Sequence, residues 1–245
     1  MKKKEKNTMK PSLTLLILAY NEEKNLENTV HICDDISKEL FDDYELLIAN
    51  DGSTDKTPEI AERLAKKNPH VKVFHNRKNM GIGYSYQKGI QIAKKKYLMW
   101  VAGDNEFTSD AIKNVISHAG EADIVVSRNV NQNVRPLYRR IISRTFANTV
   151  NLLFNLNLRY YTGLILCETA LLRKINLTAN SGSLLAEIVI KVVKTGHTYK
   201  CIPVRIRKRT SVNVLRFREI FGAVKMVTNL FIAFHIHKGK GIFKQ

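Results

Sequence analysis

Two carboxylates and an amide directly follow an apolar run in the middle of the chain. The run covers residues 97–102, and Gly103-Asp-Asn-Glu106 comes after it. Oxygen ligands grouped this closely suit Mg²⁺ or Mn²⁺, with phosphate oxygens completing the coordination shell. The same pattern is also typical of a strand-to-helix turn in which Asp104 or Thr108 caps the next helix. These residues alone leave both interpretations open.

Three other polar clusters follow apolar runs in the same way. The four clusters are Tyr20–Glu23, Asn50–Asp55, Asn79–Gly83 and Asp104–Glu106. In open parallel sheets, ligands bind outside the carboxyl ends of the strands. Four such turns at four successive strand ends therefore predict one shared site.

The segments that must position these clusters alternate between strand and helix patterns. Runs rich in aliphatic residues predict buried strands at 12–19, 44–49, 71–75, 97–102 and 122–127. Helices are expected between them, and Pro58 stands at the favoured first position of one. This alternation predicts an α/β fold with a doubly wound, mostly parallel sheet.

The second half of the chain has longer helical patterns. We expect helices at 136–156, 183–195 and 214–236, a short strand at 162–166, and a strand at 198–209. The first helix carries arginines on one side and apolar residues on the other. The last helix is rich in phenylalanine.

The charge balance favours an anionic partner. Forty Lys and Arg against 22 Asp and Glu give a net charge of +18, which suits nucleic acid, an anionic membrane surface or phosphorylated substrates. A nucleic-acid-binding protein is the weakest of these hypotheses, because no recognisable nucleic-acid-binding motif is present. A dinucleotide-binding dehydrogenase is disfavoured, because Tyr20–Glu23 replaces the glycine-rich turn.

The cysteines and the N-terminus indicate a cytosolic protein. Cys33, Cys167 and Cys201 are scattered, without metal-ligand spacing, which is typical of reduced thiols. The basic start has no apolar signal segment after it. Because no apolar run reaches about 18 residues, we predict no transmembrane helix.

Taken together, the turns resemble those of family 2 glycosyltransferases of the GT-A fold. The similarity is greatest to polyprenyl-phosphate sugar synthases such as dolichol-phosphate mannose synthase. It runs from Leu13 to about Arg209 and rests on the ordered set of motifs. These are Ala19-Tyr-Asn-Glu22, Asn50-Asp-Gly-Ser-Thr-Asp55, Asn79-Met-Gly-Ile-Gly83 and the acidic cluster.

The resemblance implies a nucleotide-diphosphate sugar as donor. It assigns Ala19, Tyr20 and Glu22 to the nucleoside pocket and Asp51 to the base or ribose. Gly81 and Gly83 would let the backbone approach the donor closely. Considered without the other motifs, each residue has an ordinary structural alternative. Asp51 would suit a turn-closing hydrogen bond, and Tyr20 would suit a buried ring.

The metal motif departs from the family pattern. The family has Asp-x-Asp after the fourth strand, and Ala102 replaces its first Asp here. The resemblance implies that Mg²⁺ or Mn²⁺ is held by Asp104, with Glu106 as a second ligand where relatives often have an amide. Transfer with inversion at the anomeric carbon is implied in the same way.

Matches in the second half point to the acceptor. Arg139 and Ser143 match an Arg-x-x-x-Ser pair that faces the acceptor phosphate in the lipid-phosphate synthases, and Ser127-Arg128 resembles the family's Ser-Arg after the fifth strand. Arginine suits a phosphate site through its bidentate fork. The alternative for these arginines is a solvated basic helix face. Arg140 and Arg144 are weaker candidates. Glu187 and Arg209 match further family positions, with Glu187 expected to orient Arg or Tyr groups or to form a buried ion pair. Tyr160 stands where relatives have Asp.

We therefore expect a basic disordered tail (1–11), a glycosyltransferase domain (12–210) and a C-terminal amphipathic helix (211–245). The leading hypothesis is sugar transfer, perhaps to a polyprenyl phosphate, by a protein peripheral to the cytoplasmic face of an anionic membrane. The final helix would equally suit packing on the domain or a dimer contact. An alternative is a degenerate protein that binds nucleotide or membrane without turnover. The oligomeric state stays open.

Overall fold

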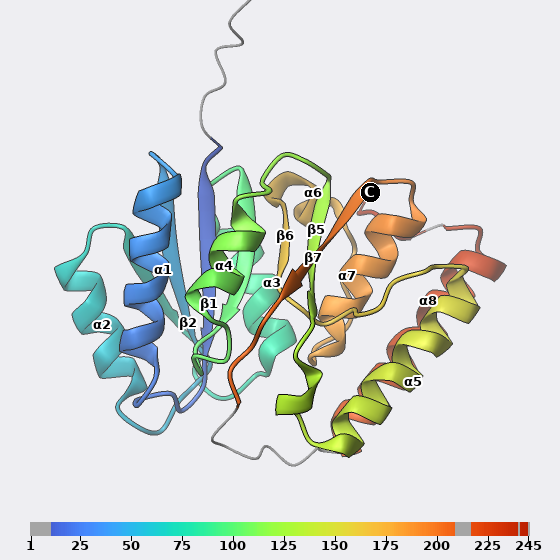
Figure 1. The fold of residues 1–245 in the computed structure, drawn as a ribbon, viewed down its shortest axis with the longest axis horizontal. Helices are drawn as coiled ribbons and strands as arrows, with labels where there is room; N and C mark the ends of the chain where they lie inside the picture. Colours follow the sequence, from blue (N-terminus) through green and yellow to red (C-terminus); the bar gives the residue numbers. More distant parts are fainter. Residues whose placement is uncertain (1–10, 209–216, 240, 245) are drawn as a thin grey trace, which may run out of the picture.

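The fold is a seven-stranded sheet with helices on both faces (Figure 1). The structure, a computed structural model, describes residues 11–208, 217–239 and 241–244. The strand order is β3-β2-β1-β4-β6-β5-β7. The strands are β1 (Leu13–Ala19), β2 (Tyr44–Asn50), β3 (Val71–His75), β4 (Tyr97–Ala102), β5 (Ile124–Asn129), β6 (Ile165–Glu168) and β7 (Tyr199–Val204).

Helices connect most of these strands. They are α1 (Leu26–Leu40), α2 (Thr57–Lys67), α3 (Ile82–Ile92), α4 (Ser109–Ile116), η1 (Gln132–Val134), α5 (Leu137–Phe154), α6 (Thr169–Lys174), α7 (Ser183–Lys194), α8 (Phe217–Phe231) and the π-helical η2 (Ile232–Ile236). The elements expected from the sequence are thus present, with ends shifted by a few residues. The largest corrections are the strand expected at 162–166, which lies at 165–168, and the strand expected at 198–209, which ends at 204.

The parallel register brings the strand ends together. Ala19 pairs with Asn50, and Leu18 pairs with Ala102. Strand β6 alone runs antiparallel, between β4 and β5. The expected doubly wound, mostly parallel sheet is therefore confirmed. The carboxyl ends of β1, β2 and β4 lie at the lower edge of the sheet in Figure 1.

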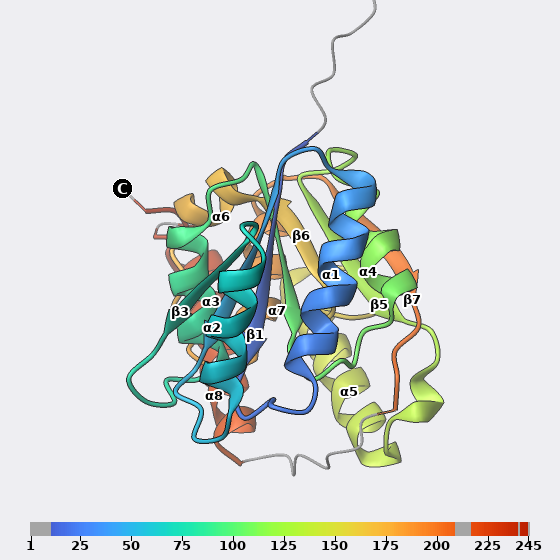
Figure 2. The same ribbon diagram turned by 90° about the vertical axis from the view of Figure 1, so that its left-hand side faces the viewer.

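Two layers of helices cover the sheet (Figure 2). On one face α1 contacts both α2 and α4, and on the other α3 contacts α6. Strands β1 and β2 are buried almost throughout because they lie between both layers. Their continuous apolar runs are typical of parallel strands covered on both sides.

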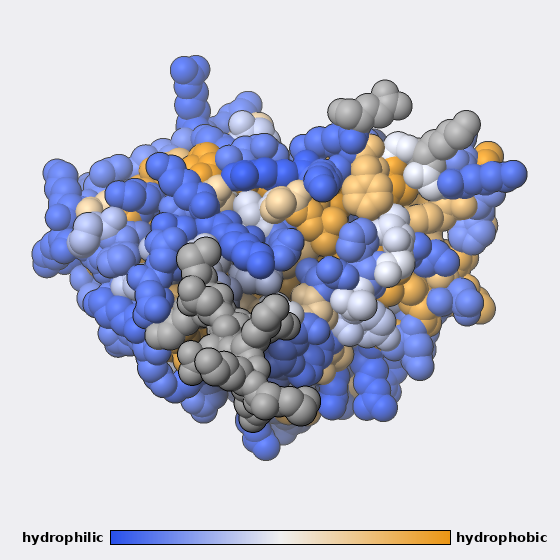
Figure 3. All heavy atoms as spheres, turned by 90° about the horizontal axis from the view of Figure 1, so that it is seen from above, coloured by the Kyte–Doolittle hydropathy of each residue, from blue (hydrophilic) through white to orange (hydrophobic). Residues whose placement is uncertain are grey.

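The C-terminal helix α8 packs on the same core. It contacts α7 and α5, and its Met226 and Leu230 are buried in the main hydrophobic cluster. Its other side exposes apolar residues that include Phe221 and Val224. Figure 3 shows hydrophobic atoms gathered on the side of the molecule where α5, α7 and α8 lie.

One helical stretch among the described residues is long and apolar enough to cross a membrane. It spans Glu219–Ile236 and has a mean hydropathy of 1.4, and 11% of the stretch is buried. From the sequence we predicted no transmembrane helix, because the uninterrupted apolar run of this segment is short. In the structure, η2 continues α8 and brings the helical stretch to the required length.

Two sequence expectations fall outside the described residues. Most of the tail expected at 1–11 lies in residues 1–10, and Arg209 lies between residues 208 and 217. The boundary expected between the glycosyltransferase domain and the C-terminal helix, at residues 210 and 211, also lies between residues 208 and 217. These expectations stay predictions.

Candidate functional site

The turns after β1 and β2 are joined by hydrogen bonds at the carboxyl edge of the sheet. The backbone N–H of Asn21 donates to Ser53 Oγ at 2.9 Å, and that of Glu22 donates to Thr57 Oγ1 at 2.8 Å. Among the predicted nucleoside residues, Ala19 is buried, Glu22 is half-buried, and the ring of Tyr20 is 42% exposed. The exposed ring of Tyr20 thus lies beside this double turn, where it is available to a ligand.

Asp51 holds the neighbouring loop in place. Its carboxylate accepts hydrogen bonds from Asn76 Nδ2 at 2.8 Å, Met80 N at 3.0 Å and Gly81 N at 2.8 Å. The residue is 5% exposed. A carboxylate has about four acceptor positions, so most of its capacity is used within the protein. These partners lie 25 to 30 residues further along the chain, so the contacts are not the local turn-closing hydrogen bond offered as the alternative for Asp51. Its predicted contact with the base or ribose stays a prediction.

The two glycines expected to admit the donor lie close to the backbone of Asn180, and their role toward the donor stays a prediction. A Cβ atom at Gly83 would lie 2.4 Å from the carbonyl carbon of Asn180, and one at Gly81 would lie 3.0 Å from the Asn180 oxygen. Gly81 also has φ of 91°, a conformation that favours glycine. Close backbone packing against Asn180 therefore requires these glycines.

The acidic turn after β4 begins with a close backbone approach. The Gly103 N–H donates to Leu18 O at 2.8 Å, which ties the end of β4 to β1. Asp104 Oδ1 accepts the Glu106 N–H at 3.0 Å. Thr108 accepts the Ala111 N–H at 3.1 Å and caps α4. The helix-cap interpretation is thus correct for Thr108, whereas Asp104 stays at the edge of the sheet.

Glu106 is paired with an arginine. Arg135 Nη2 lies 2.7 Å from Glu106 Oε1, and Arg135 Nη1 donates to the hydroxyl of Tyr160. Although burial lowers the pKa of Arg135, its pKa is raised overall because Tyr160 and Glu106 stabilise the charged form. This three-residue contact is here named the Glu106–Arg135–Tyr160 link. It engages Oε1 of Glu106, and the role of Glu106 as a second metal ligand stays a prediction.

The remaining residues fit a metal only in part. Mg²⁺ is commonly held by one or two carboxylates together with substrate phosphates, and Asp104 fits that requirement. Ala102 supplies no ligand, and Glu106 accepts from Arg135. No group of three or more His, Cys, Asp and Glu that could hold a metal occurs in residues 11–208, 217–239 and 241–244.

An arginine-rich hollow of about 650 Å³ lies beside this link. Arg128 at the end of β5 and Ser143 on α5 line it, and Tyr160 lines it too. The weaker candidates Arg140 and Arg144 are also in the lining, whereas Arg139 is not among the lining residues. A second hollow, of about 670 Å³, is formed by α2 and His75 and includes none of the predicted site residues.

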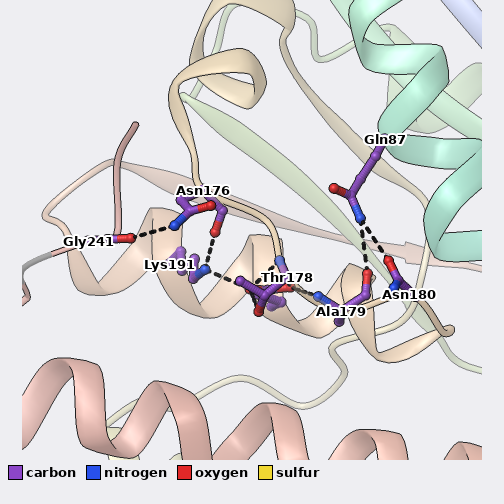
Figure 4. Close-up of polar contacts among 8 residues, drawn as sticks. Gln87, Asn176, Thr178, Ala179, Asn180, Lys191 and Gly241 are labelled. Carbon is purple, nitrogen blue, oxygen red and sulfur yellow. Dashed lines mark hydrogen bonds and ion pairs between the residues drawn. The ribbon is translucent and has the colours of Figure 1, made fainter. Parts of the chain in front are cut away.

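Among the described residues, Glu187 has no hydrogen bond or ion pair with the Arg or Tyr groups that we expected it to orient. It is fully buried in α7, where it pairs with Lys191 at 2.6 Å. Its carboxylate also accepts from Thr178 and Ala179 (Figure 4). The expected alternative, a buried ion pair, is correct.

Sequence reasoning missed the roles of Arg135 and Arg207. Arg207 donates to the backbone oxygens of Asn105 and Phe107 and so holds the acidic turn as well. It lies 102 residues from Asn105 in the sequence, so no local spacing indicates the contact. For Arg135 the only usable signal is that a buried carboxylate at Glu106 requires a cation nearby.

Comparisons with known proteins give a consistent result. The family model described as glycosyl transferase family 2 matches residues 14–177. A putative glycosyltransferase of Bacillus subtilis, EpsH, is 32% identical over 117 residues, which are 47% of this chain and 33% of the relative. A dolichyl-phosphate beta-glucosyltransferase of Trichomonas vaginalis is 28% identical over 135 residues, 50% of this chain and 42% of the relative. The matches thus span less than half of these relatives.

The fold is similar to solved structures over almost the whole chain. Glucosyl-3-phosphoglycerate synthase of Mycobacterium tuberculosis, in complex with Mn²⁺, UDP and glucosyl-3-phosphoglycerate, has a TM-score of 0.66. The identity is 14%, and the match covers 91% of this chain and 79% of that one. The expected GT-A architecture is therefore confirmed.

We expect the Glu106–Arg135–Tyr160 link to stabilise the protein. Replacing Arg135 with Met leaves the buried Glu106 carboxylate without its cation, so we expect the free energy of unfolding to fall by about 3–5 kcal/mol. Denaturant unfolding followed by circular dichroism measures it. Arg140→Met is the matched control on exposed α5 surface, with an expected change within about 0.5 kcal/mol. Equal stability of the two variants would refute the importance of the link.

Proposed function

The chain belongs to glycosyl transferase family 2, and we propose that it transfers a sugar from a nucleotide-diphosphate sugar to an acceptor bound in the arginine-rich hollow. One observation carries the proposal. The Glu106–Arg135–Tyr160 link joins the acidic turn after β4 to the wall of the hollow, since Tyr160 belongs to its lining. A donor at the carboxyl edge of the sheet and an acceptor in the hollow would therefore meet at this link.

The donor would lie over the turns after β1 and β2. Tyr20 offers an exposed ring to the base, and Ala19 and Glu22 border the same turn. Asp51 would act mainly by holding Met80 and Gly81 in position. The solved structures with this fold that contain UDP, together with Mn²⁺ or Mg²⁺, support a nucleotide as the donor's leaving group.

Asp104 is the protein carboxylate that we assign to a divalent cation. When bound, Mg²⁺ or Mn²⁺ would neutralise the negative charge on the departing diphosphate. Glu106 would act through Arg135, holding the turn that presents Asp104.

The reaction we propose is a displacement at the anomeric carbon. An acceptor oxygen forms the new bond to that carbon, and the bond between the carbon and the donor diphosphate breaks. A phosphate acceptor is already anionic, so it needs no strong base, and Tyr160 in place of the family Asp does not prevent its attack.

The hollow suits an acceptor with an anionic head and an apolar tail, such as a polyprenyl phosphate. Arg128, Arg140 and Arg144 line it together with Leu137 and Ile141. Arginine binds phosphate oxygens bidentately. Asn129, also in the lining, has a buried side-chain amide without a hydrogen-bond partner among the described residues, and such a group favours a polar ligand. The relative named as a dolichyl-phosphate beta-glucosyltransferase supports the same class of acceptor.

We propose that α5 and α8 place this hollow at the cytoplasmic face of an anionic membrane. Their exposed side chains include Leu137 and Ile141 on α5 and Phe221 and Val224 on α8. Apolar side chains beside arginines suit the lipid interface. We expect the Phe221→Ser variant to bind anionic vesicles more weakly than the wild type, which co-sedimentation measures. Ile92→Ser on α3 is the control. Undiminished binding of the Phe221→Ser variant would contradict it.

A degenerate protein that binds nucleotide without turnover is the second candidate. The substitution at Ala102 and the pairing of Glu106 with Arg135 favour it, since both reduce the carboxylates available to a metal. The following variant separates the two candidates.

Replacing Asp104 with Ala should reduce sugar transfer by about 10²- to 10³-fold, a magnitude typical of losing one group that stabilises developing charge. Release of nucleoside diphosphate from a panel of nucleotide sugars, with Mg²⁺ or Mn²⁺ present, measures it. Asp110→Ala, on the exposed first turn of α4, is the matched control. Full activity of Asp104→Ala would refute its role, and UDP or GDP binding without transfer by the wild type would favour the degenerate candidate.

Replacing Arg128 with Gln should raise the KM for a polyprenyl-phosphate acceptor by about 10- to 100-fold, because hydrogen bonds to charged groups contribute about 1.5–3 kcal/mol. Donor KM should change little. Arg63→Gln on α2, which removes a surface arginine paired with Glu27, is the control. A rise in donor KM alone would place Arg128 outside the acceptor site.

A further inference from the structure

Glu187 is a fully buried carboxylate on a helix that is otherwise largely apolar where it is buried. Its oxygens accept from the Thr178 N–H at 3.1 Å, from Thr178 Oγ1 at 2.9 Å and from the Ala179 N–H at 2.9 Å. Lys191 Nζ completes the set at 2.6 Å and also donates to Asn176 O (Figure 4). The acceptor capacity of this carboxylate is fully used within the protein.

A buried ion pair is weak evidence for stability, because apolar residues of similar volume often stabilise a protein equally well. What the pair does determine is the path of residues 176–182, here named the bridging segment. Without Glu187, the backbone N–H groups of Thr178 and Ala179 lose their acceptor. The pair therefore selects one conformation of the bridging segment.

The bridging segment is packed against the glycine turn on the donor side. A Cβ atom at Gly83 would lie 2.4 Å from the Asn180 carbonyl carbon and 2.8 Å from Ala179 O. Gln87 on α3 donates to Ala179 O at 3.2 Å (Figure 4). Backbone atoms cannot give way here as a flexible side chain could, so we expect a displacement of the segment to displace the turn as well.

The contacts continue from the glycine turn to Asp51. The N–H of Gly81 donates to Asp51 Oδ2 at 2.8 Å, while its α-carbon faces Asn180. A continuous series of contacts therefore runs from Lys191 and Glu187 to the end of β2.

The other side of the bridging segment meets the C-terminal part of the chain. Asn176 donates through its N–H to Ile242 O at 2.8 Å and through Nδ2 to Gly241 O at 3.1 Å. A Cβ atom at Gly222 of α8 would lie 3.0 Å from Ser181 Oγ. The segment is thus held between α8 and the donor-side turn.

We propose that Glu187 is a positioning residue for donor binding: paired with Lys191, it fixes the bridging segment, which in turn fixes the Gly81–Gly83 turn and its bonds to Asp51. Only the expected effect on donor binding rests on the proposed function. The mechanical coupling between Glu187 and the turn is independent of it.

The coupling is tested by amide hydrogen exchange without any ligand. In the double variant Glu187→Leu/Lys191→Met, which keeps the helix core apolar, the Met80 and Gly81 amides should exchange at least about 10-fold faster, since local opening sets these rates. Unchanged rates at Met80 and Gly81, with faster exchange at Thr178 and Ala179, would overturn the coupling.

Gly83→Ala tests the same coupling from the opposite end, and carries the test alone if the double variant does not fold. Its methyl group displaces Asn180, so the Thr178 and Ala179 amides should exchange faster. Gly182→Ala is the control within the bridging segment, because its Cβ atom would meet only Glu219 Oε2 at 3.6 Å. Wild-type exchange in Gly83→Ala would overturn the proposal.

Calorimetric titration with UDP and GDP tests the consequence for the donor. Both the double variant and Gly83→Ala should bind the nucleotide at least about 10-fold more weakly than wild type and Gly182→Ala. Equal affinity would overturn the positioning role. If the wild type binds neither nucleotide, the proposed function fails, while the exchange rates still decide the coupling.

Discussion

The parallel register of β1, β2 and β4 is the constraint on which the site depends. Ala19 lies beside Asn50, and Leu18 lies beside Ala102, so three polar turns distant in sequence emerge at one edge. The turns then bond to one another: the Asp51 N–H donates to Ala19 O, and the Gly103 N–H donates to Leu18 O. A slip in this register would separate the residues that we assign to the donor.

Buried charge is the second constraint. Asp51 accepts from backbone and amide N–H groups, Glu106 from Arg135, and Glu187 from Lys191 and the bridging segment. Each of these carboxylates fixes a loop, because leaving a buried charge uncompensated would be strongly destabilising. Among the acidic positions predicted from the family pattern, Asp104 is the one that we assign to the chemistry itself.

Local patterns predicted much of the fold. Aliphatic runs and turn residues located β1 to β5 and the helices between them, because buried parallel strands impose a clear composition. The strand β6 was shifted, since four residues in an antiparallel position give only a weak signal.

The partners of the acidic residues were not predictable. Glu106 and Arg135 are 29 residues apart, and Gly83 and Asn180 are almost a hundred apart. Such contacts follow from the tertiary fold and have no sequence periodicity. The family resemblance named candidate positions, and in the structure the carboxylates of Asp51 and Glu187 hold loops.

Similarity to known proteins establishes the family and the fold, whereas the substrates depend on side chains particular to this chain. The most direct measurement is a crystal structure of the protein with UDP or GDP and Mn²⁺. The account predicts the base beside Tyr20, the diphosphate next to Asp104, and the glycine turn still covered by Asn180. A nucleotide bound instead in the hollow between α2 and His75, or a diphosphate remote from Asp104, would contradict it.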